Sequence, residues 1–567
     1  MKVLLLVSAF NGLSQRVLTV LDAAGHQVSV QLAVDEPSMI RAARLSGPDL
    51  ILCPFLRDRV PAAVWSRWPT IVIHPGPVGD RGPSSLDWAI TDAIPVWGVT
   101  ALQAVEEMDA GPIWAHREFP MPSEPARKSS LYGGPVADAA VACVEEVMVK
   151  AADPAFTPTP LARAHRPVPG TGVRPMMRQQ NRAFSWEEPA AAVLRRIRAA
   201  DGSPGVRARL GGSAAHLFDA HVPAGKPVRL PAARPGTIVG HDGDRVAVAT
   251  GNGYLWIGQV KMVDGNNPTG IGGLGRLGVK QPAALALQHA LAGVPLRRGP
   301  DRIRYRRHGD VGELVFDVHN GAMSPYWSRR LAAALRRACA ADTSVLVVRG
   351  GVDAFCNGID LNAIEMAPDP QAAAWASIRA INAVCRAIAA MSPQVIVAGV
   401  SGNAGAGGVM LPLGAEVVAA RDGIVLNPFY DIGLYGSELH TQVLPARVGP
   451  VAARRLLSQR LPIDAAAACR LGLVDVVGPR DPEEYAAWLL EMAREYVGGE
   501  RRRQARARKA AALSGPPLTY WEAKELAEMA MDIFDDRNQF AERRAAFVYK
   551  QRPQVTPRHL ANHPQAA

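Results

Sequence analysis

The sequence lacks the features that mark secreted, membrane-spanning and zinc-binding proteins. Its six cysteines are scattered and form no CxxC pair, which argues against a disulfide framework or a zinc site and favours a reducing compartment. No stretch offers ~18 uninterrupted apolar residues, so no membrane span is expected. The first apolar run breaks at Asn11-Gly12 with no cleavage pattern nearby, and it predicts a buried strand rather than a signal peptide. We therefore expect a cytoplasmic protein without a metal site.

Aromatic residues are also scarce, at 6% of the chain, whereas the net charge is +11. A basic surface could attract nucleic acid or anionic small molecules. The densest basic run, at residues 501–509 (RRRQARARK), contains no aromatic side chain, so it does not predict a nucleic-acid site. We interpret this run as the solvated face of an Arg-rich helix.

The apolar runs predict an α/β protein of several domains, because 567 residues are too many for one hydrophobic core. Near the N-terminus, runs such as VLLLV, DLILCPF and TIVIHPG alternate with helical stretches. This alternation predicts an open parallel sheet with helices on both faces, over residues 1–178. After a Pro-rich linker, residues 179–262 combine one helix with short strands (PGTIVG, DRVAVAT, YLWIGQV), which is typical of a small β-barrel domain.

The C-terminal half has its own α/β pattern. Residues 263–300 begin with a Gly-rich stretch and are expected to connect the two halves. Residues 301–500 contain the apolar runs ELVFDVHNG, SVLVVRGG and QVIVAGVSG separated by Ala/Leu-rich helical stretches, which predicts a second α/β domain. Residues 501–567 predict a helical C-terminal segment.

A candidate catalytic pair lies in the first domain. His74 ends the run IVI, at the carboxyl edge of the predicted sheet where open α/β sheets bind ligands, and Asp109 follows in EEMDAGPIW. A nearby carboxylate could hold the histidine as a proton shuttle. The alternative is a purely structural histidine.

The segments HPGPVGDRG and MDAGPI resemble the N10-formyltetrahydrofolate transferases, especially the methionyl-tRNA formyltransferases, and FSW with PGTIV resembles the small C-terminal domain of that family. The family works with Asn-x-His plus the Asp of D-x-G, so the resemblance implies catalytic roles for His74 and Asp109. Val72 stands where the family has Asn, whose side chain donates to the formyl oxygen. Losing one such donor typically costs ~10²–10³ in rate. The resemblance therefore favours a better nucleophile than an amine, such as a thiolate, or different oxyanion donors.

The same resemblance implies where folate binds. In the related enzymes the folate ring lies against the backbone of two loops. Here these loops correspond to Pro54, Phe55 and Leu56 and to the residues around Met108.

Two Gly-rich segments follow strands of the second α/β domain, at residues 350–366 and 400–423. Glycine lets the backbone approach a ligand, and the N–H groups of a following helix can stabilise developing negative charge. The strings AFCNGID and SGNAGAGGVML, with NPFYDIG and LPARVG, resemble the crotonase (enoyl-CoA hydratase/isomerase) superfamily over about residues 310–480. The resemblance implies that the backbone amides of Asn357 and Gly407 polarise a CoA thioester carbonyl. It places Gly358, Asp360 and Gly408 in the CoA-binding site.

The two glutamates of the hydratases have no counterpart, because the matching positions hold Met410 and Phe429. Water addition to an enoyl-CoA is therefore not expected. The segment NPFYDIGLYGSELH offers Tyr430, Tyr435 and Glu438 as replacements, and we take Tyr430 and Glu438 as the candidate catalytic side chains. Each could instead be structural. A glutamate in an apolar pocket would have a raised pKa and could exchange protons near neutral pH.

The whole chain, including GDRGPSSLDWAI and FVYKQRPQVTPRHLANH, resembles the HoxX family of hydrogenase maturation proteins. The resemblance implies a bifunctional enzyme that moves the formyl group of N10-formyltetrahydrofolate to coenzyme A and then decarbonylates formyl-CoA to CO, a ligand of [NiFe] hydrogenase. A channel or a swinging pantetheine arm would link the two sites. The implied partners are these small molecules, together with hydrogenase maturation proteins or the hydrogenase large subunit, and neither nucleic acid nor a membrane.

Two alternatives remain open at this point. The chain could be a non-catalytic scaffold that binds folate and CoA, although such a scaffold would need neither His74 nor Asp109. It could also be a formyltransferase that modifies an amine of an acyl-CoA.

Overall fold

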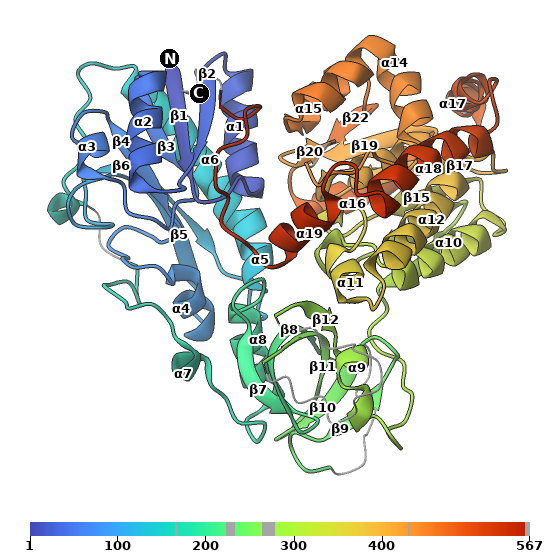
Figure 1. Cartoon of the computed structure of the whole chain (residues 1–567), viewed down its shortest axis with the longest axis horizontal. Coiled ribbons are helices and arrows are strands. Elements are labelled where there is room, and N and C mark those ends of the chain that lie inside the picture. Colours follow the sequence, from blue (N-terminus) through green and yellow to red (C-terminus); the bar gives the residue numbers. More distant parts are fainter. Residues whose placement is uncertain (165–167, 223–232, 264–277, 429–430, 562–567) are drawn as a thin grey trace. The chain divides into compact units, whose positions relative to one another are not determined.

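The computed structural model describes residues 1–164, 168–222, 233–263, 278–428 and 431–561, and the chain divides into two compact units (Figure 1). Unit 1 comprises Met1–Pro300 and the C-terminal stretch that begins at Arg552, whereas unit 2 comprises Asp301–Gln551. Both units contain the predicted α/β architecture. The finer domain boundaries expected from the sequence stay predictions, and the Gly-rich residues 264–277 lie outside the described part of the chain.

The first sheet of unit 1 has six strands in the order β2-β1-β3-β4-β5-β6. Their bounds are β1 (Lys2–Val7), β2 (Gln27–Leu32), β3 (Leu50–Cys53), β4 (Thr70–His74), β5 (Val96–Gln103) and β6 (Ile113–Pro120). The parallel pairing predicted for the first four strands is confirmed. The strands β5 and β6, which the sequence patterns did not indicate, extend the sheet with antiparallel pairing.

Helices cover both faces of this sheet, as predicted. The helices of this region are α1 (Gly12–Ala23), α2 (Glu36–Ser46), α3 (Ala62–Trp65), α4 (Ser85–Thr91), α5 (Lys128–Leu131), the π-helix η1 (Tyr132–Val136), α6 (Ala137–Ala151) and the short 3-10 helix η2 (Leu161–Arg163). Helices α1 and α6 pack together, and α2 packs with α3 (Figure 1). The Asn11-Gly12 pair that breaks the first apolar run starts α1, because the Asn11 side chain accepts the Ser14 N–H at 3.0 Å.

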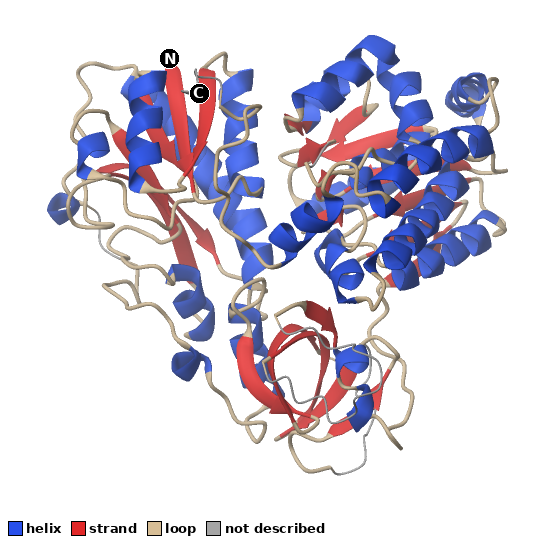
Figure 2. Cartoon of the chain, in the orientation of Figure 1, coloured by secondary structure: helices blue, strands red, loops and turns tan. Residues whose placement is uncertain are grey.

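A second sheet in unit 1 forms the predicted small barrel. Its strands curve into a ring (Figure 2) and run β7-β8-β11-β10-β9, with β12 paired to β11 and all pairs antiparallel. The elements are α7 (Gln179–Arg182), α8 (Ala190–Ala199), β7 (Val206–Leu210), β8 (Ser213–His221), β9 (Ile238–His241), β10 (Val246–Thr250), β11 (Gly253–Met262), β12 (Lys280–Pro282), α9 (Ala283–Ala286) and the 3-10 helix η3 (Gln288–Ala290). Val193 and Ile197 of α8 are fully buried in the core of this barrel.

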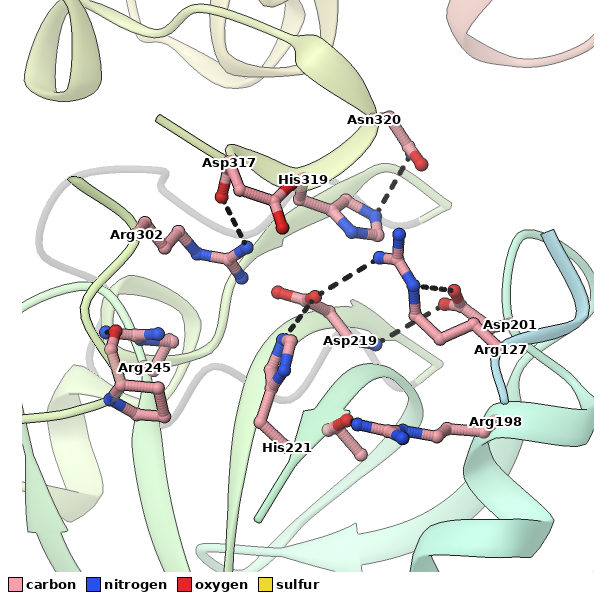
Figure 3. A network of polar contacts seen from close by, with 12 residues as sticks. Arg127, Arg198, Asp201, Asp219, His221, Arg245, Arg302, Asp317, His319 and Asn320 are labelled. Carbon is pink, nitrogen blue, oxygen red and sulfur yellow. Dashed lines mark hydrogen bonds and ion pairs between the residues drawn. The ribbon is translucent and has the colours of Figure 1, made fainter. Parts of the chain in front are cut away.

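Ionic contacts join the barrel to the preceding α/β layer. Arg127 lies 3.7 Å from the carboxylates of both Asp201 and Asp219, and His221 Nε2 lies 2.8 Å from Asp219 (Figure 3). Ser129 Oγ donates to Asp201 at 3.1 Å. Because both aspartates are almost fully buried, these contacts compensate charges that would otherwise be costly to bury.

The main sheet of unit 2 runs β13-β14-β15-β17-β19-β22 and is parallel except for the β13-β14 pair. A second sheet runs β16-β18-β20-β21 and carries the two Gly-rich segments. The strands are β13 (Ile303–His308), β14 (Val311–Phe316), β15 (Val345–Arg349), β16 (Ala354–Cys356), β17 (Val395–Val400), β18 (Asn403–Gly405), β19 (Val417–Arg421), β20 (Val425–Asn427), β21 (Ile463–Asp464) and β22 (Val476–Gly478).

Helices pack against the sheets of unit 2 and complete the predicted helical C-terminal segment. They are η4 (His319–Gly321), α10 (Pro325–Cys339), α11 (Leu361–Met366), α12 (Pro370–Ala389), α13 (Gly407–Met410), η5 (Leu411–Gly414), α14 (His440–Gln459), α15 (Ala465–Arg470), α16 (Pro482–Arg494), α17 (Gly499–Ala512), α18 (Leu518–Phe534) and α19 (Phe540–Val548). Helix α19 ends at Val548, so the prediction of a helical segment over residues 501–567 is wrong for the described residues 549–561, which contain no helix.

The chain then returns to unit 1 and covers the edge of its first sheet. The backbone N–H of Leu32 in the edge strand β2 donates to Thr556 Oγ1 at 3.0 Å, and that of Val30 donates to Leu560 O at 2.9 Å. Pairing an edge strand removes a template for aggregation. This contact gives a structural reason for the TPRHL part of the C-terminal motif.

The basic run at residues 501–509 lies on α17, but only one side of this helix is solvated. Arg502 and Arg506 donate to backbone carbonyls of Ser344, Pro393 and Ser392 at 2.6–2.8 Å. Lys509 is buried and lies 3.0 Å from the buried carboxylate of Glu416. The interpretation of the run as a solvated face is therefore wrong for these three residues, because the arginines donate to backbone carbonyls and Lys509 pairs with a buried carboxylate.

Within the described residues, no helix combines the length and apolar character that a membrane crossing requires. In the same part of the chain, no three or more His, Cys, Asp or Glu side chains gather into a metal-binding group.

Candidate active sites

His74 is the last residue of β4 and lies at the carboxyl edge of the parallel strands of unit 1. Its ring is buried and lies between two carboxylates. His74 Nε2 is 2.9 Å from Asp80 Oδ2, which is a hydrogen bond, whereas His74 Nδ1 is 3.6 Å from Asp109 Oδ1, which is too long for one. The structure thus brings the predicted pair together and adds Asp80 to it.

Asp109 is held in an unusual backbone conformation. Its φ is +55°, in the left-handed region that non-glycine residues seldom adopt. Asp109 Oδ2 accepts the Gly82 N–H at 3.1 Å, and Arg81 pairs with the neighbouring Glu107. Gly111 makes the close approach behind this loop possible, since a Cβ there would lie 1.8 Å from Gln103 O. These contacts tie the Asp109 loop to the loop that follows His74.

Val72 lies two residues before His74 and is half-buried among apolar side chains such as Val78 and Ile113. The side chain therefore supplies no hydrogen-bond donor next to His74. The expectation that conventional amine formylation lacks one oxyanion donor rests on this position.

The predicted folate-binding residues lie around the end of β3. Pro54 is buried, Leu56 packs into the core beside β3, and Phe55 meets Tyr132 edge-on with ring centroids 6.0 Å apart. The Phe55 carbonyl accepts the Ser8 N–H at 2.8 Å. Met108 is 55% exposed, so its side chain is free to contact a ligand. A folate role for these residues stays a prediction.

In unit 2, the two Gly-rich segments form adjacent strands, β16 and β18. Gly407 begins α13, and its N–H has no acceptor within the part of the chain that the structure describes. Ala406 before it has φ +49° and ψ −129°, a strained conformation for a non-glycine residue. Gly408 packs so closely that a Cβ would lie 1.9 Å from Cys356 O. This backbone leaves the Gly407 amide available, as an oxyanion donor requires.

The other predicted oxyanion amide is already engaged. The Asn357 N–H donates to Gly321 O at 2.8 Å, and its side-chain Nδ2 donates to Asn320 O at 2.8 Å. Gly358 has φ +75°, and its N–H lies 3.4 Å from Cys356 Sγ. A role for Asn357 in polarising a thioester would require the bond to Gly321 to open.

Asp360 is the N-cap of α11. Its carboxylate accepts the N–H groups of Asn362 and Ala363 at 3.0 and 3.2 Å. Burial raises the pKa of this carboxyl, and the two backbone hydrogen bonds oppose that shift. The structure gives Asp360 a local structural role, and its contact with CoA stays a prediction.

Glu438 lies directly against the Gly407 backbone. A Cβ on Gly407 would be 2.2 Å from Glu438 Oε1, so the carboxyl group touches the residue that offers the free amide. Glu438 is only 5% exposed, and burial raises its pKa to about 7, with the Ser437 hydrogen bond opposing and the Glu525 carboxylate adding to the shift. The predicted proton exchange near neutral pH is therefore possible at this position.

A strained turn presents Glu438. Both Glu438 and Leu439 have left-handed φ values, +63° and +60°. The Glu438 N–H donates to Asn382 Oδ1 at 2.9 Å. The fully buried Glu525 of α18 accepts the Leu439 N–H at 2.9 Å and the Thr441 N–H at 2.8 Å. Consecutive strained residues persist only where surroundings over-determine them, and they are frequent at functional sites.

His440 completes this turn. Its Nδ1 is 3.3 Å from Glu525 Oε1, and Tyr435 meets the His440 ring edge-on at 5.3 Å. Burial lowers the pKa of His440, but the Glu525 carboxylate, the Ser437 carbonyl and Glu438 together raise it, and the net shift is upward. Met410 is buried and apolar, as expected, whereas Phe429 and Tyr430 lie outside the described residues.

Three of these residues were not singled out from the sequence. Asp80 stands inside the GDRG motif, where its position six residues after His74 was a usable signal. Asn382 and Glu525 lie on helices with no motif of their own, so only the fold brings them to Glu438.

Comparison with known proteins agrees with this arrangement. The family of enoyl-CoA hydratases and isomerases matches residues 316–556, and the C-terminal domain of formyl transferases matches residues 176–270. The methionyl-tRNA formyltransferase of a Synechococcus species is 30% identical over 188 residues, which cover 32% of this chain and 55% of that protein. The chain thus joins a formyltransferase-type unit to a unit of the enoyl-CoA hydratase/isomerase type.

Two relatives match the entire chain. The hydrogenase maturation factor HoxX of Bradyrhizobium diazoefficiens is 38% identical over 571 residues, 99% of this chain and 97% of that one. The crystal structure of HypX from Aquifex aeolicus in complex with tetrahydrofolic acid has a TM-score of 0.91 and 34% identity, covering 100% of this chain and 99% of that one. The chain belongs to the HoxX family of hydrogenase maturation factors.

Proposed function

We propose that this protein makes CO for hydrogenase maturation in two steps, one in each unit. Unit 1 transfers the formyl group of N10-formyltetrahydrofolate to the thiol of coenzyme A, and unit 2 decarbonylates the resulting formyl-CoA. The product supplies the CO ligand of the [NiFe] hydrogenase. One CoA molecule must present its thiol to both sites.

The His74 site supports the first step. Its imidazole and carboxylates can move a proton, and the tetrahydrofolate bound to the HypX relative supports folate as the ligand of this unit. Val72 supplies no donor for the formyl oxygen, so a thiol suits the site better than an amine. A thiol attacks readily with little base assistance.

The contact between Glu438 and Gly407 carries the proposal for the second step. The thioester oxygen would accept the Gly407 N–H, and the Glu438 carboxylate would take the formyl proton. The C–S bond then breaks, CO leaves, and the thiolate receives the proton from Glu438. Formyl-CoA thus yields CO and CoA without any oxidant, reductant or water.

Burial suits Glu438 to this role, since a desolvated carboxylate is a stronger base than one in water. Met410, which stands where a hydratase has a glutamate, cannot activate water. Both features favour loss of CO over hydrolysis of the thioester.

Two variants test the steps separately. His74→Gln should lower formyl-CoA formation from formyl-folate and CoA by about 10²–10⁴, the usual contribution of a general acid–base group. It should leave CO release from added formyl-CoA unchanged. Glu438→Gln should leave formyl-CoA formation unchanged and lower CO release from added formyl-CoA. CO is measured by its binding to reduced haem, and formyl-CoA by mass spectrometry.

The outcomes also separate the alternatives. If the wild-type protein makes no CO from formyl-folate and CoA, the proposal is contradicted, and the non-catalytic scaffold that binds folate and CoA is favoured instead. A formylated amine in the mass spectrum, without CO, would favour amine transfer instead.

A further inference from the structure

Asp80 lies beside His74 but is not a member of the catalytic pair predicted from the sequence. It is 3% exposed and lies in the loop after β4, six residues beyond His74. Its carboxylate forms a 2.9 Å hydrogen bond with His74 Nε2. A buried carboxylate on a buried imidazole is more than a loop anchor, because it determines which ring nitrogen carries the proton.

The hydrogen bond fixes one tautomer. A carboxylate only accepts, so Nε2 must carry the hydrogen that points to Asp80. Nδ1 of the neutral ring then keeps its lone pair. Asp109 Oδ1 lies 3.6 Å from Nδ1, too far for a hydrogen bond, so among the described residues this lone pair stays available to accept a proton.

The chain makes room for this contact with a glycine. A Cβ on Gly76 would lie 2.3 Å from Asp80 Oδ2 and 2.6 Å from His74 Nε2, so any side chain there would displace the pair. The Gly76 carbonyl is itself held, since it accepts the Thr100 hydroxyl at 2.9 Å. The loop after β4 is therefore built around the contact between His74 and Asp80.

We propose that Asp80 is the positioning residue of the formyl-transfer site, and that it holds His74 with Nδ1 free to carry the transferred proton. The inference rests on the formyl transfer proposed above. In that reaction the CoA sulfur bonds to the formyl carbon, and the bond between that carbon and N10 breaks. The thiol proton must end on N10, and His74 Nδ1 takes it from sulfur and returns it to nitrogen.

Asp80 has two roles in this reaction. Before the transfer it keeps the unprotonated Nδ1 directed at the substrates. While the ring carries both protons, the Asp80 carboxylate at 2.9 Å and the Asp109 carboxylate on the other side offset the imidazolium charge. This stabilisation is needed most here because Val72 cannot stabilise the opposite charge on the formyl oxygen.

The test uses the full-length protein and the variant Asp80→Asn, which keeps the shape of the side chain but can present an amide N–H to the ring. We expect the kcat of formyl-CoA formation to fall by about 10²–10⁴, the usual contribution of a general acid–base group. The KM for formyl-folate should change less than about threefold, since the effect lies in the transition state. CO release from added formyl-CoA should stay at the wild-type rate, which shows that the variant is folded.

A second variant disrupts the contact between His74 and Asp80 from another position. Gly76→Ala should displace Asp80 from His74 and cause a similar loss of kcat. The matched controls are Asp153→Asn, at an exposed position of unit 1, and Gly253→Ala, where a Cβ meets nothing within 4 Å. Both controls should behave as wild type.

The tautomer itself is measured by ¹⁵N NMR of histidine-labelled protein, with His74→Gln to assign the signal. We expect Nε2–H in the wild type and a mixture in Asp80→Asn. An Nδ1–H signal in the wild type, or an unchanged kcat in Asp80→Asn, would overturn the assignment. If the wild type forms no formyl-CoA, the proposed function fails, and the His74 tautomer still decides whether Asp80 positions the ring.

Discussion

The two units differ in the groups that surround the carboxylates of their candidate sites. In unit 1, His74 lies between two carboxylates, so opposite charges compensate one another as a proton passes. In unit 2, the Glu438 carboxyl touches an uncharged glycine backbone and has another carboxylate, Glu525, nearby. The first arrangement suits a proton shuttle between two heteroatoms. The second produces a strong, desolvated base, as removal of a proton from carbon requires.

The two sites also differ in what holds them. His74 stands on a regular strand and is fixed by its own loop, through Asp80 and Gly76. Glu438 stands on a strained turn that depends on Asn382 and Glu525, which lie on separate helices. Substitutions on these two helices, which are distant from Glu438 in the sequence, should therefore damage the Glu438 site and leave the His74 site intact.

The largest effect is expected from Glu525→Ala. This change leaves the Leu439 and Thr441 N–H groups and the His440 ring without their buried partner. Breaking such a buried pair costs about 3–5 kcal/mol. We expect a matching loss of stability in urea unfolding and loss of CO release, with formyl-CoA formation retained.

Glu528→Ala is the matched control, because Glu528 lies on the same helix and pairs with Arg537 at the surface. It should cost no more than about 1 kcal/mol. Equal effects of the two variants would contradict the role of Glu525.

Gly407→Ala changes the Glu438 site directly. The new Cβ would lie 2.2 Å from Glu438 Oε1, so the carboxyl must move away from the free amide. We expect CO release from added formyl-CoA to fall by about 10²–10³, the effect of losing an aligned oxyanion donor.

Gly515→Ala is the control for this change, since a Cβ there meets nothing within 4 Å. Wild-type CO release by Gly407→Ala would show that the contact between Glu438 and Gly407 has no part in the reaction.

The sequence predicted what local patterns encode. Continuous apolar runs located the parallel strands β1, β3 and β4. The motif segments singled out His74 and Asp109, which the structure brings within 3.6 Å of each other, and Glu438, which lies against Gly407. Contacts between distant segments could not be predicted in this way. Thr556 covers the edge of β2 from more than 500 residues away, and no periodicity reports such a contact.

The residues around the sites were missed for a related reason. Glu525 lies among other charged residues of α18, and only burial distinguishes it from the partly exposed Glu528. Likewise, Arg502 and Arg506 resemble a solvated face until the carbonyls of residues 392–393 are placed opposite them. The Asn357 amide matched the motif, but its bond to Gly321 depends on a turn that the motif does not include.

The smallest predicted effect is a pH-dependent change in the free energy of unfolding, and it arises from Glu438 in the second site. Burial raises the pKa of Glu438 to about 7 from the 4.5 expected in the unfolded chain. As pH rises from about 4.5, the unfolded chain loses this proton first, so the contribution of Glu438 to the stability of the wild type falls until about pH 7 and then stays level. Glu438→Gln does not titrate. It should therefore gain stability relative to wild type between pH 5 and pH 8 by up to about 3 kcal/mol. Urea unfolding at both pH values measures this gain, with Glu528→Gln as the control. A difference that does not change with pH would show that Glu438 ionises as easily as in water, and the strong-base role would be lost with it.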